Sequence, residues 1–236
     1  MIRTTWMLLR IITNPRIMRT PLRVMRELQR RGTPRLGSVM DAHRVQRRRL
    51  LPFLRTWLRT ELLSRHRGQW VVNSFVPPFP GAAFNRLFEN ALSGRRLSPV
   101  SAYLGITADC PYHCWHCSAR NRRTGALSTQ HWLSVIAELH ALGCSMIGFT
   151  GGEPFARADL PQLVHAAAAG GATTIVFTSG ALASARRLAA LRAAGLWGLC
   201  VSVDHPDPAE HDRLRGAPGA FARAHNCVRR ARATGF

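Results

Sequence analysis

The segment Cys110-Pro-Tyr-His-Cys114-Trp-His-Cys117 places three cysteines on one short stretch directly behind an apolar run. Downstream, Thr150-Gly-Gly-Glu-Pro154 follows a second apolar run. Three thiolates on one tight loop can bind three irons of a cubane iron–sulfur cluster, whereas an electron-transfer cluster usually takes four cysteines. One iron is then left open to another ligand, so the pattern indicates chemistry on a bound molecule.

Two other uses of these cysteines stay open from the residues alone. Zinc is bound by three thiolates and one imidazole in Cys3His sites, and here His113 or His116 would be the fourth ligand. Zinc motifs, however, usually show two separated ligand pairs, whereas this loop holds every candidate ligand within eight residues. A disulfide role is weaker, because the sequence has no secretory signal and its other cysteines are scattered singly. These other cysteines are predicted to be small buried hydrophobes: Cys144, Cys200 and Cys227.

The C-x3-C-x2-C spacing, His116 before the last cysteine and the later Gly-Gly-Glu-Pro together resemble the radical S-adenosylmethionine (radical SAM) superfamily. The resemblance implies that Cys110, Cys114 and Cys117 hold a [4Fe-4S] cluster whose open iron is chelated by S-adenosyl-L-methionine. It also implies an external electron donor, because cleavage of the cofactor to methionine and a 5'-deoxyadenosyl radical is reductive. The radical abstracts a hydrogen atom from a substrate that the sequence does not identify, such as a peptide or a cofactor or lipid precursor.

The resemblance further implies a set of cofactor-binding residues. His116 occupies a position where the family usually has an aromatic residue packed against adenine. Gly151, Gly152, Glu153 and Pro154 form the segment that binds the amino group of the methionine moiety, and the two glycines let the backbone approach a ligand closely.

Three more polar residues join this set at the ends of later apolar runs. Ser202 and Asp204 match in type the Ser-x-Asp that similar proteins present near the cofactor's ribose, and Ser179 lies where relatives often have Asn. Ser202 and Asp204 suit equally well a capping role for the segment that follows, and both interpretations stay open. The pair His211-Asp212 is predicted to serve in helix packing and hydrogen bonding, outside the site.

From residue 99 onward, short apolar runs alternate with capped helical patterns, which predicts an α/β fold with a parallel sheet and right-handed crossovers. Strands are predicted at 103–108, 145–150, 173–179 and 198–203, and helices at 128–142, 159–169 and 184–194, with Ser128, Asp159 and Ser184 as N-caps. The runs lack strict alternation, which is typical of strands buried on both faces. A partial (β/α) barrel of the radical SAM type fits, with each candidate site segment following a strand.

Similar enzymes have six strand–helix units, and about four fit between residue 99 and Phe236. The chain is therefore expected to be a fragment, to be completed by a partner chain, or to be a degenerate relative.

Positive charge is unevenly distributed along the sequence. The chain has 236 residues, 46% of them hydrophobic, and its 33 basic residues are all arginine. Residues 1–70 contain 17 arginines and three acidic residues. We therefore predict a basic, mainly helical extension over 1–68, with helices near 20–32 and 39–67, then a linker or pre-barrel segment over 69–98, and the core over 99–236. The extension suits an anionic membrane surface or nucleic acid.

An apolar stretch at residues 6–12 is too short to span a bilayer, and reduced thiols suit a cytoplasmic location, with peripheral attachment at a membrane through the extension.

The sequence leaves two function classes. The first class is a radical SAM enzyme, favoured by Glu153 and the glycine pair. The second is a truncated or degenerate non-catalytic iron–sulfur protein that binds nucleic acid or membrane through its arginine-rich arm, and the short barrel favours it.

Overall fold

The computed structural model describes residues 64–73, 75–93, 99–119 and 127–236. The chain forms two compact units, Met1–Val100 and Ser101–Phe236. The described part of the first unit contains β1 (Ser64–His66), β2 (Gln69–Val71) and α4 (Ala82–Ser93). The predicted limits of the extension and the linker stay predictions, and most of the extension, with its predicted helices and binding partners, lies outside the described residues.

The end of the predicted 39–67 helix is wrong. Ser64–His66 is a strand that pairs antiparallel with β2. The two strands are joined by a turn in which Arg67 has a φ of 50° and Gly68 a φ of 77°. Two successive residues in this left-handed region reverse the chain tightly, and glycine adopts it without strain. The short turn at Gly68 outweighs the helical periodicity of the preceding residues.

The second unit is built on a four-stranded parallel sheet. Its strands are β3 (Ser101–Thr107), β4 (Met146–Gly151), β5 (Thr173–Thr178) and β6 (Gly198–Val201), and they lie in the order β3-β4-β5-β6. One row across the sheet pairs Leu104 with Phe149, Phe149 with Val176, and Val176 with Leu199. Spatial order follows chain order, as expected for successive βα units with right-handed crossovers. The predicted α/β class is confirmed.

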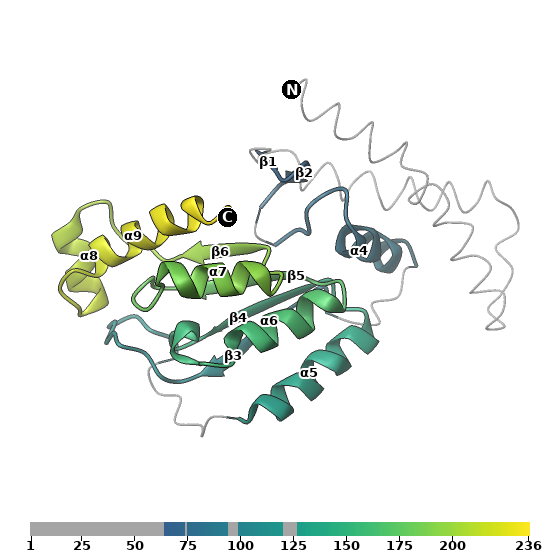
Figure 1. The fold of residues 1–236 in the computed structure, drawn as a ribbon, viewed down its shortest axis with the longest axis horizontal. Helices are drawn as coiled ribbons and strands as arrows, with labels where there is room; N and C mark the ends of the chain where they lie inside the picture. Colours follow the sequence, from purple (N-terminus) through teal and green to yellow (C-terminus); the bar gives the residue numbers. More distant parts are fainter. Residues whose placement is uncertain (1–63, 74, 94–98, 120–126) are drawn as a thin grey trace, which may run out of the picture. The chain divides into compact units, whose positions relative to one another are not determined.

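Three helices connect these strands and cover one face of the sheet: α5 (Thr129–Leu142), α6 (Leu160–Ala169) and α7 (Ala185–Ala193), as Figure 1 shows. Ser128 accepts a hydrogen bond from His131 N, and Ser184 accepts one from Arg187 N, so both act as the predicted N-caps. Asp159 occupies the N-cap position of α6 without a side-chain cap bond. Its carboxylate instead pairs with Arg157, which lowers the pKa of Asp159.

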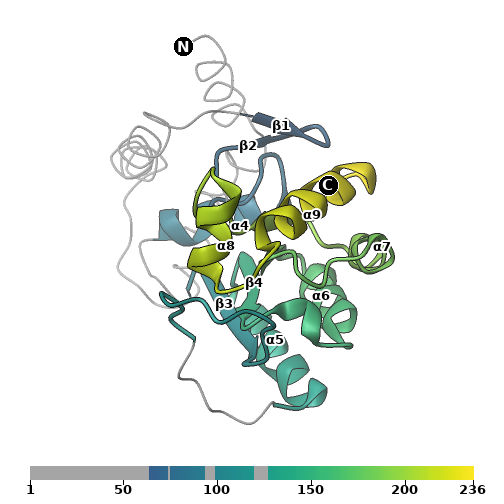
Figure 2. The ribbon, with the colours of Figure 1, turned by 90° about the vertical axis from the view of Figure 1, so that its left-hand side faces the viewer.

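The main core lies between the sheet and these helices. It contains Phe149, Leu163, Leu188 and other fully buried side chains. After β6 the chain forms α8 (Pro208–Arg215) and α9 (Ala220–Ala233), and α9 contacts α7 and β6, which Figure 2 shows from the side. Its Cys227 enters the core fully buried, and burial raises the pKa of this thiol to about 11. Cys227 and Cys144 are buried small hydrophobes as predicted, whereas Cys200, on strand β6, is only partly buried.

No helix in the part of the chain that the structure describes has both the length and the hydropathy that crossing a bilayer requires.

The core assignment predicts the effect of truncating one leucine of α6. Leu163→Ala should lower the free energy of unfolding by about 2–5 kcal/mol, because the fully buried side chain leaves a cavity that the sheet and helices cannot fill. Leu142→Ala, which removes the same atoms from a side chain that is 51% exposed at the end of α5, should change it by less than about 1 kcal/mol. Urea denaturation followed by circular dichroism measures both, and similar losses in the two variants would contradict the assignment.

Candidate cofactor site

The three predicted cluster ligands lie on the loop that leaves the carboxyl end of β3, residues 108–119, here called the cysteine loop. Cys114 is buried, with 7% of its surface exposed, whereas Cys110 is exposed and Cys117 is partly buried. Cys117 N donates to Cys114 O at 3.3 Å, which closes a tight turn. The loop therefore carries three sulfurs in different degrees of burial within one short turn.

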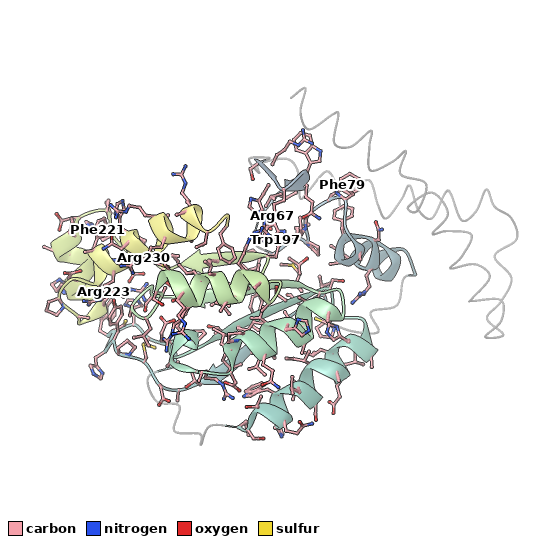
Figure 3. The ribbon with its side chains drawn as sticks, in the orientation of Figure 1. Arg67, Phe79, Trp197, Phe221, Arg223 and Arg230 are labelled. Atoms are coloured by element: carbon pink, nitrogen blue, oxygen red, sulfur yellow. The ribbon has the colours of Figure 1, made fainter. Side chains whose placement is uncertain are left out.

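Tyr112 anchors the cysteine loop to the segment between α8 and α9. Together with Cys114 it packs against Ala217 and Ala220 in a small apolar cluster. Its hydroxyl accepts a hydrogen bond from Arg223 Nε at 2.8 Å, and Arg223 lies in the first turns of α9 (Figure 3). Arg223 also donates to Pro218 O. The loop is thus held by apolar packing and by one guanidinium that joins three segments.

The glycine pair after β4 joins this edge of the sheet to the cysteine loop. Gly152 N donates to Thr107 O and Glu153 N donates to Asp109 O, each at 2.7 Å. A Cβ on Gly151 would lie 2.3 Å from Thr107 O, and one on Gly152 would lie 2.3 Å from Asp109 O. Gly151 also has a φ of 123°, which side-chain-bearing residues rarely adopt. Both glycines are therefore required for the close approach of this segment to the backbone of Thr107 and Asp109, apart from any contact with a ligand.

Glu153 is fully buried, and its carboxylate receives four hydrogen bonds. Oε1 accepts from Phe155 N at 3.2 Å and from Thr178 Oγ1 at 2.7 Å. Oε2 accepts from Ser179 N at 2.9 Å and from Ser179 Oγ at 2.5 Å. A carboxylate has about four acceptor positions, so protein donors already fill those of Glu153. In this structure the side chain joins the ends of β4 and β5.

Two residues of this arrangement differ in how visible they are in the sequence. Ser179, predicted as a cofactor contact, is here a partner of Glu153 through both its amide and its hydroxyl. Sequence reasoning did not assign Thr178 to the site, although a hydroxyl residue at the end of a buried strand is a signal for such a role. Thr178 is 2% exposed, and its Oγ1 also accepts a hydrogen bond from Gly180 N.

Asp204 lies after β6 and links it to the cysteine loop and to α8. Its Oδ2 is 2.7 Å from Arg215 Nε and 3.5 Å from His116 Nε2, and its Oδ1 accepts from Arg215 Nη2 at 2.9 Å. Ser202, at the same strand end, donates its backbone N–H to Thr178 O at 2.9 Å. Sequence reasoning missed Arg215, because nothing distinguishes it from the other arginines of the chain.

The capping alternative for Ser202 and Asp204 is wrong. The N-cap of α8 is Asp207, which accepts a hydrogen bond from Glu210 N at 2.9 Å. The three polar residues lie within six positions and all are good N-caps by type, so the sequence alone could not choose among them.

The predicted packing role of His211 and Asp212 is confirmed. His211 is 1% exposed, its Nδ1 accepts from Asp204 N at 3.2 Å, and its ring meets Phe221 edge-on. Burial lowers the pKa of His211, which favours the neutral imidazole that this hydrogen bond needs. Asp212 accepts from Gly219 N and Phe221 N, and the hydrogen bond from Phe221 is the largest cause that lowers its pKa. Both residues fix the α8–α9 turn against which the cysteine loop packs.

The donor set suits a cubane cluster. Within residues 64–73, 75–93, 99–119 and 127–236, no group of three or more His, Cys, Asp or Glu side chains converges as ligands of one metal ion must. A cubane does not need such convergence, because each thiolate binds a different iron. Cys110, Cys114 and Cys117 are free thiols, and sulfur donors of this kind are the ones that iron–sulfur clusters take.

Comparison with known families agrees with this arrangement. The family model described as the radical SAM superfamily matches residues 104–236, more than half of the chain. The chain therefore belongs to the radical SAM superfamily, whose cofactors are a [4Fe-4S] cluster and S-adenosyl-L-methionine.

Individual relatives extend the comparison. A PqqA peptide cyclase of Rhodopseudomonas palustris is 39% identical over 134 residues, which cover 56% of this chain and 36% of that protein. An AdoMet-dependent heme synthase of Oleidesulfovibrio alaskensis is 35% identical over 119 residues, covering 49% of this chain and 31% of the relative. The chain thus spans about a third of the length of these curated relatives.

A solved structure supports the partial barrel. Streptococcus suis SuiB bound to the precursor peptide SuiA has a TM-score of 0.52 and 15% identity, over 83% of this chain and 44% of that one. At this identity the likeness shows the fold alone.

The buried carboxylate gives a prediction for this edge of the sheet. Glu153→Gln should lower the free energy of unfolding by about 2–4 kcal/mol, because the new amide turns N–H groups toward donors of Thr178 or Ser179. Asp207→Asn is the matched control: it makes the same acid-to-amide change at an exposed N-cap, where Asn caps as well as Asp. Urea denaturation measures both variants. Equal stability of Glu153→Gln and the parent chain would contradict the four-bond arrangement.

Proposed function

We propose that this chain is the cofactor-binding part of an enzyme that reductively cleaves S-adenosyl-L-methionine and uses the resulting 5'-deoxyadenosyl radical to abstract a substrate hydrogen. The observation that carries the proposal is the direct bonding of the glycine-pair segment to the cysteine loop, through Glu153 N–Asp109 O, and to the end of β3 just before it, through Gly152 N–Thr107 O. One segment carries the sulfur ligands, and the other carries the predicted contact for the methionine moiety. Their fixed spacing supports a cluster and a cofactor held side by side.

The four strand ends are connected to one another by residues of the chain itself. Gly152 joins the ends of β3 and β4, Glu153 joins those of β4 and β5, and Ser202 joins those of β5 and β6. His116 and Asp204 lie within 3.5 Å of each other and bring the cysteine loop to the end of β6. Such preorganisation favours a site that must hold a reactive molecule in one orientation.

In this proposal the chain's residues have separate tasks. Cys110, Cys114 and Cys117 hold the cluster. The backbone of Gly151 to Glu153 and Pro154 borders the methionine moiety, His116 borders the adenine, and Ser202 and Asp204 border the ribose. Asp204 has acceptor capacity left for a hydroxyl, because the carboxylate offers about four positions and the hydrogen bond from Arg215 Nη2 takes one of them.

For the substrate we favour a peptide. The PqqA peptide cyclase, which is 39% identical to this chain over 134 residues, is named for a peptide. An external electron donor is part of the proposal, because reductive cleavage consumes an electron.

Anaerobic reconstitution tests the proposal. The chain should take up about four irons and, with dithionite and S-adenosyl-L-methionine, release 5'-deoxyadenosine detectable by mass spectrometry. Cys114→Ala should lose both the cluster absorbance and the product, since one iron loses its ligand. Cys144→Ala is the matched control, because Cys144 is fully buried in the core and it should keep its iron.

The remaining outcomes separate the alternatives. Stable iron uptake without 5'-deoxyadenosine would reject the enzyme and support the non-catalytic iron–sulfur protein. Tight binding of zinc in place of iron would reject both.

A further inference from the structure

We propose that Arg215 is a positioning residue that orients the Cys114 ligand and raises the reduction potential of the cluster. The inference rests on the proposed function, because it concerns the cluster that Cys114 would hold. Arg215 Nη1 donates to Cys114 Sγ at 3.9 Å, within the range of a hydrogen bond to sulfur. Sulfur and guanidinium come from residues 101 positions apart, so the fold brings them together.

The guanidinium of Arg215 is held in one orientation. Its Nε lies 2.7 Å from Asp204 Oδ2, and its Nη2 donates to Asp204 Oδ1 at 2.9 Å. Nε and Nη2 form one edge of the planar group, so Nη1 is directed away from this edge and meets Cys114. The side chain is only 12% exposed, which limits screening by solvent. Asp204 thus aims a charged donor at the thiol.

The backbone also brings α8 against the cysteine loop. Gly216 caps the C-terminus of α8 with a φ of 60°, and a Cβ there would lie 3.0 Å from His113 O. The loop therefore passes directly over the last turn of α8. The C-terminus of a helix carries a partial negative charge, which would oppose added negative charge on a nearby cluster. Arg215 lies in this last turn, and its positive guanidinium, rather than the partial negative charge of the helix end, is the group that contacts Cys114.

This placement has a defined electrochemical consequence. Reduction adds one electron, and hydrogen bonds to the sulfurs and nearby charge are among the factors that set the potential of an iron–sulfur cluster. A guanidinium beside a ligand sulfur stabilises the reduced state more than the oxidised state. The Asp204 carboxylate opposes this effect, but it binds the other edge of the guanidinium, so the charge in contact with the sulfur is positive.

The test is the midpoint potential of the reconstituted full chain, measured by an anaerobic dithionite titration followed by electron paramagnetic resonance. Arg215→Gln should lower the reduced-to-oxidised ratio at a fixed potential about tenfold, equivalent to about 59 mV for one electron. Arg215→Lys keeps the charge and should retain most of the parent potential.

Arg213→Gln is the matched control. Arg213 is on the same helix, its side chain is 67% exposed, and it pairs with Glu210. Removing this charge should leave the potential unchanged, because solvent screens it. An equal shift in Arg213→Gln and Arg215→Gln would overturn the inference in favour of a general charge effect.

The outcomes separate the inference from the proposed function. Unchanged potential in Arg215→Gln with full iron content overturns the inference and leaves the function intact. If Arg215→Gln fails to hold iron, Arg215→Lys decides: a parent-like potential supports the inference, and a clear downward shift overturns it. A parent chain with a cluster but no 5'-deoxyadenosine rejects the function, and the potentials still decide the inference. A parent chain without any cluster rejects both.

Discussion

A buried negative charge determines how the functional edge of the sheet is assembled. Glu153 is fully buried, and a carboxylate removed from water is stable only with donors around it. Its donors are Phe155 N and the hydroxyl and amide groups of Thr178 and Ser179, which lie on two successive strand ends. These ends can take only the relative positions that keep all donors in reach. The charge therefore fixes how the ends of β4 and β5 lie against each other.

The cysteine loop is held from two sides by different means. On the side of β4 the contact is backbone to backbone, and Gly151 and Gly152 permit it because a Cβ would meet carbonyl oxygens at 2.3 Å. On the side of α8 and α9 the contact uses side chains, with Tyr112 in an apolar cluster and bonded to Arg223. Cys114 lies in the buried part of the loop and Cys110 in its exposed part. Support from two sides lets a segment without helix or strand hold its ligands in place.

The sequence predicts the sheet better than it predicts the site. Apolar runs and helix caps give β3 to β6 and α5 to α7 nearly to the residue, because burial and capping are local in sequence. The turn at Gly68 was missed because its left-handed backbone leaves only a single glycine as a signal. The cap of α8 was misassigned because Ser202, Asp204 and Asp207 are alike in type, and only the path of the chain selects Asp207. The requirement for Gly151 and Gly152 could be predicted, because a Cβ at either position would meet backbone carbonyl oxygens.

Arg215 could not be assigned in this way, and the reason is shared by several other arginines among the described residues of this unit. Arg157 donates to Ile106 O and Leu127 O, and Arg187 donates to Phe155 O. Arg223 serves Tyr112 and Pro218 in the same manner. The guanidinium offers five donors in a rigid fork, so one side chain can join several segments, which a lysine ammonium does less well. The charges of Arg157, Arg187 and Arg223 therefore have structural roles, and these arginines are weak evidence for an anionic partner.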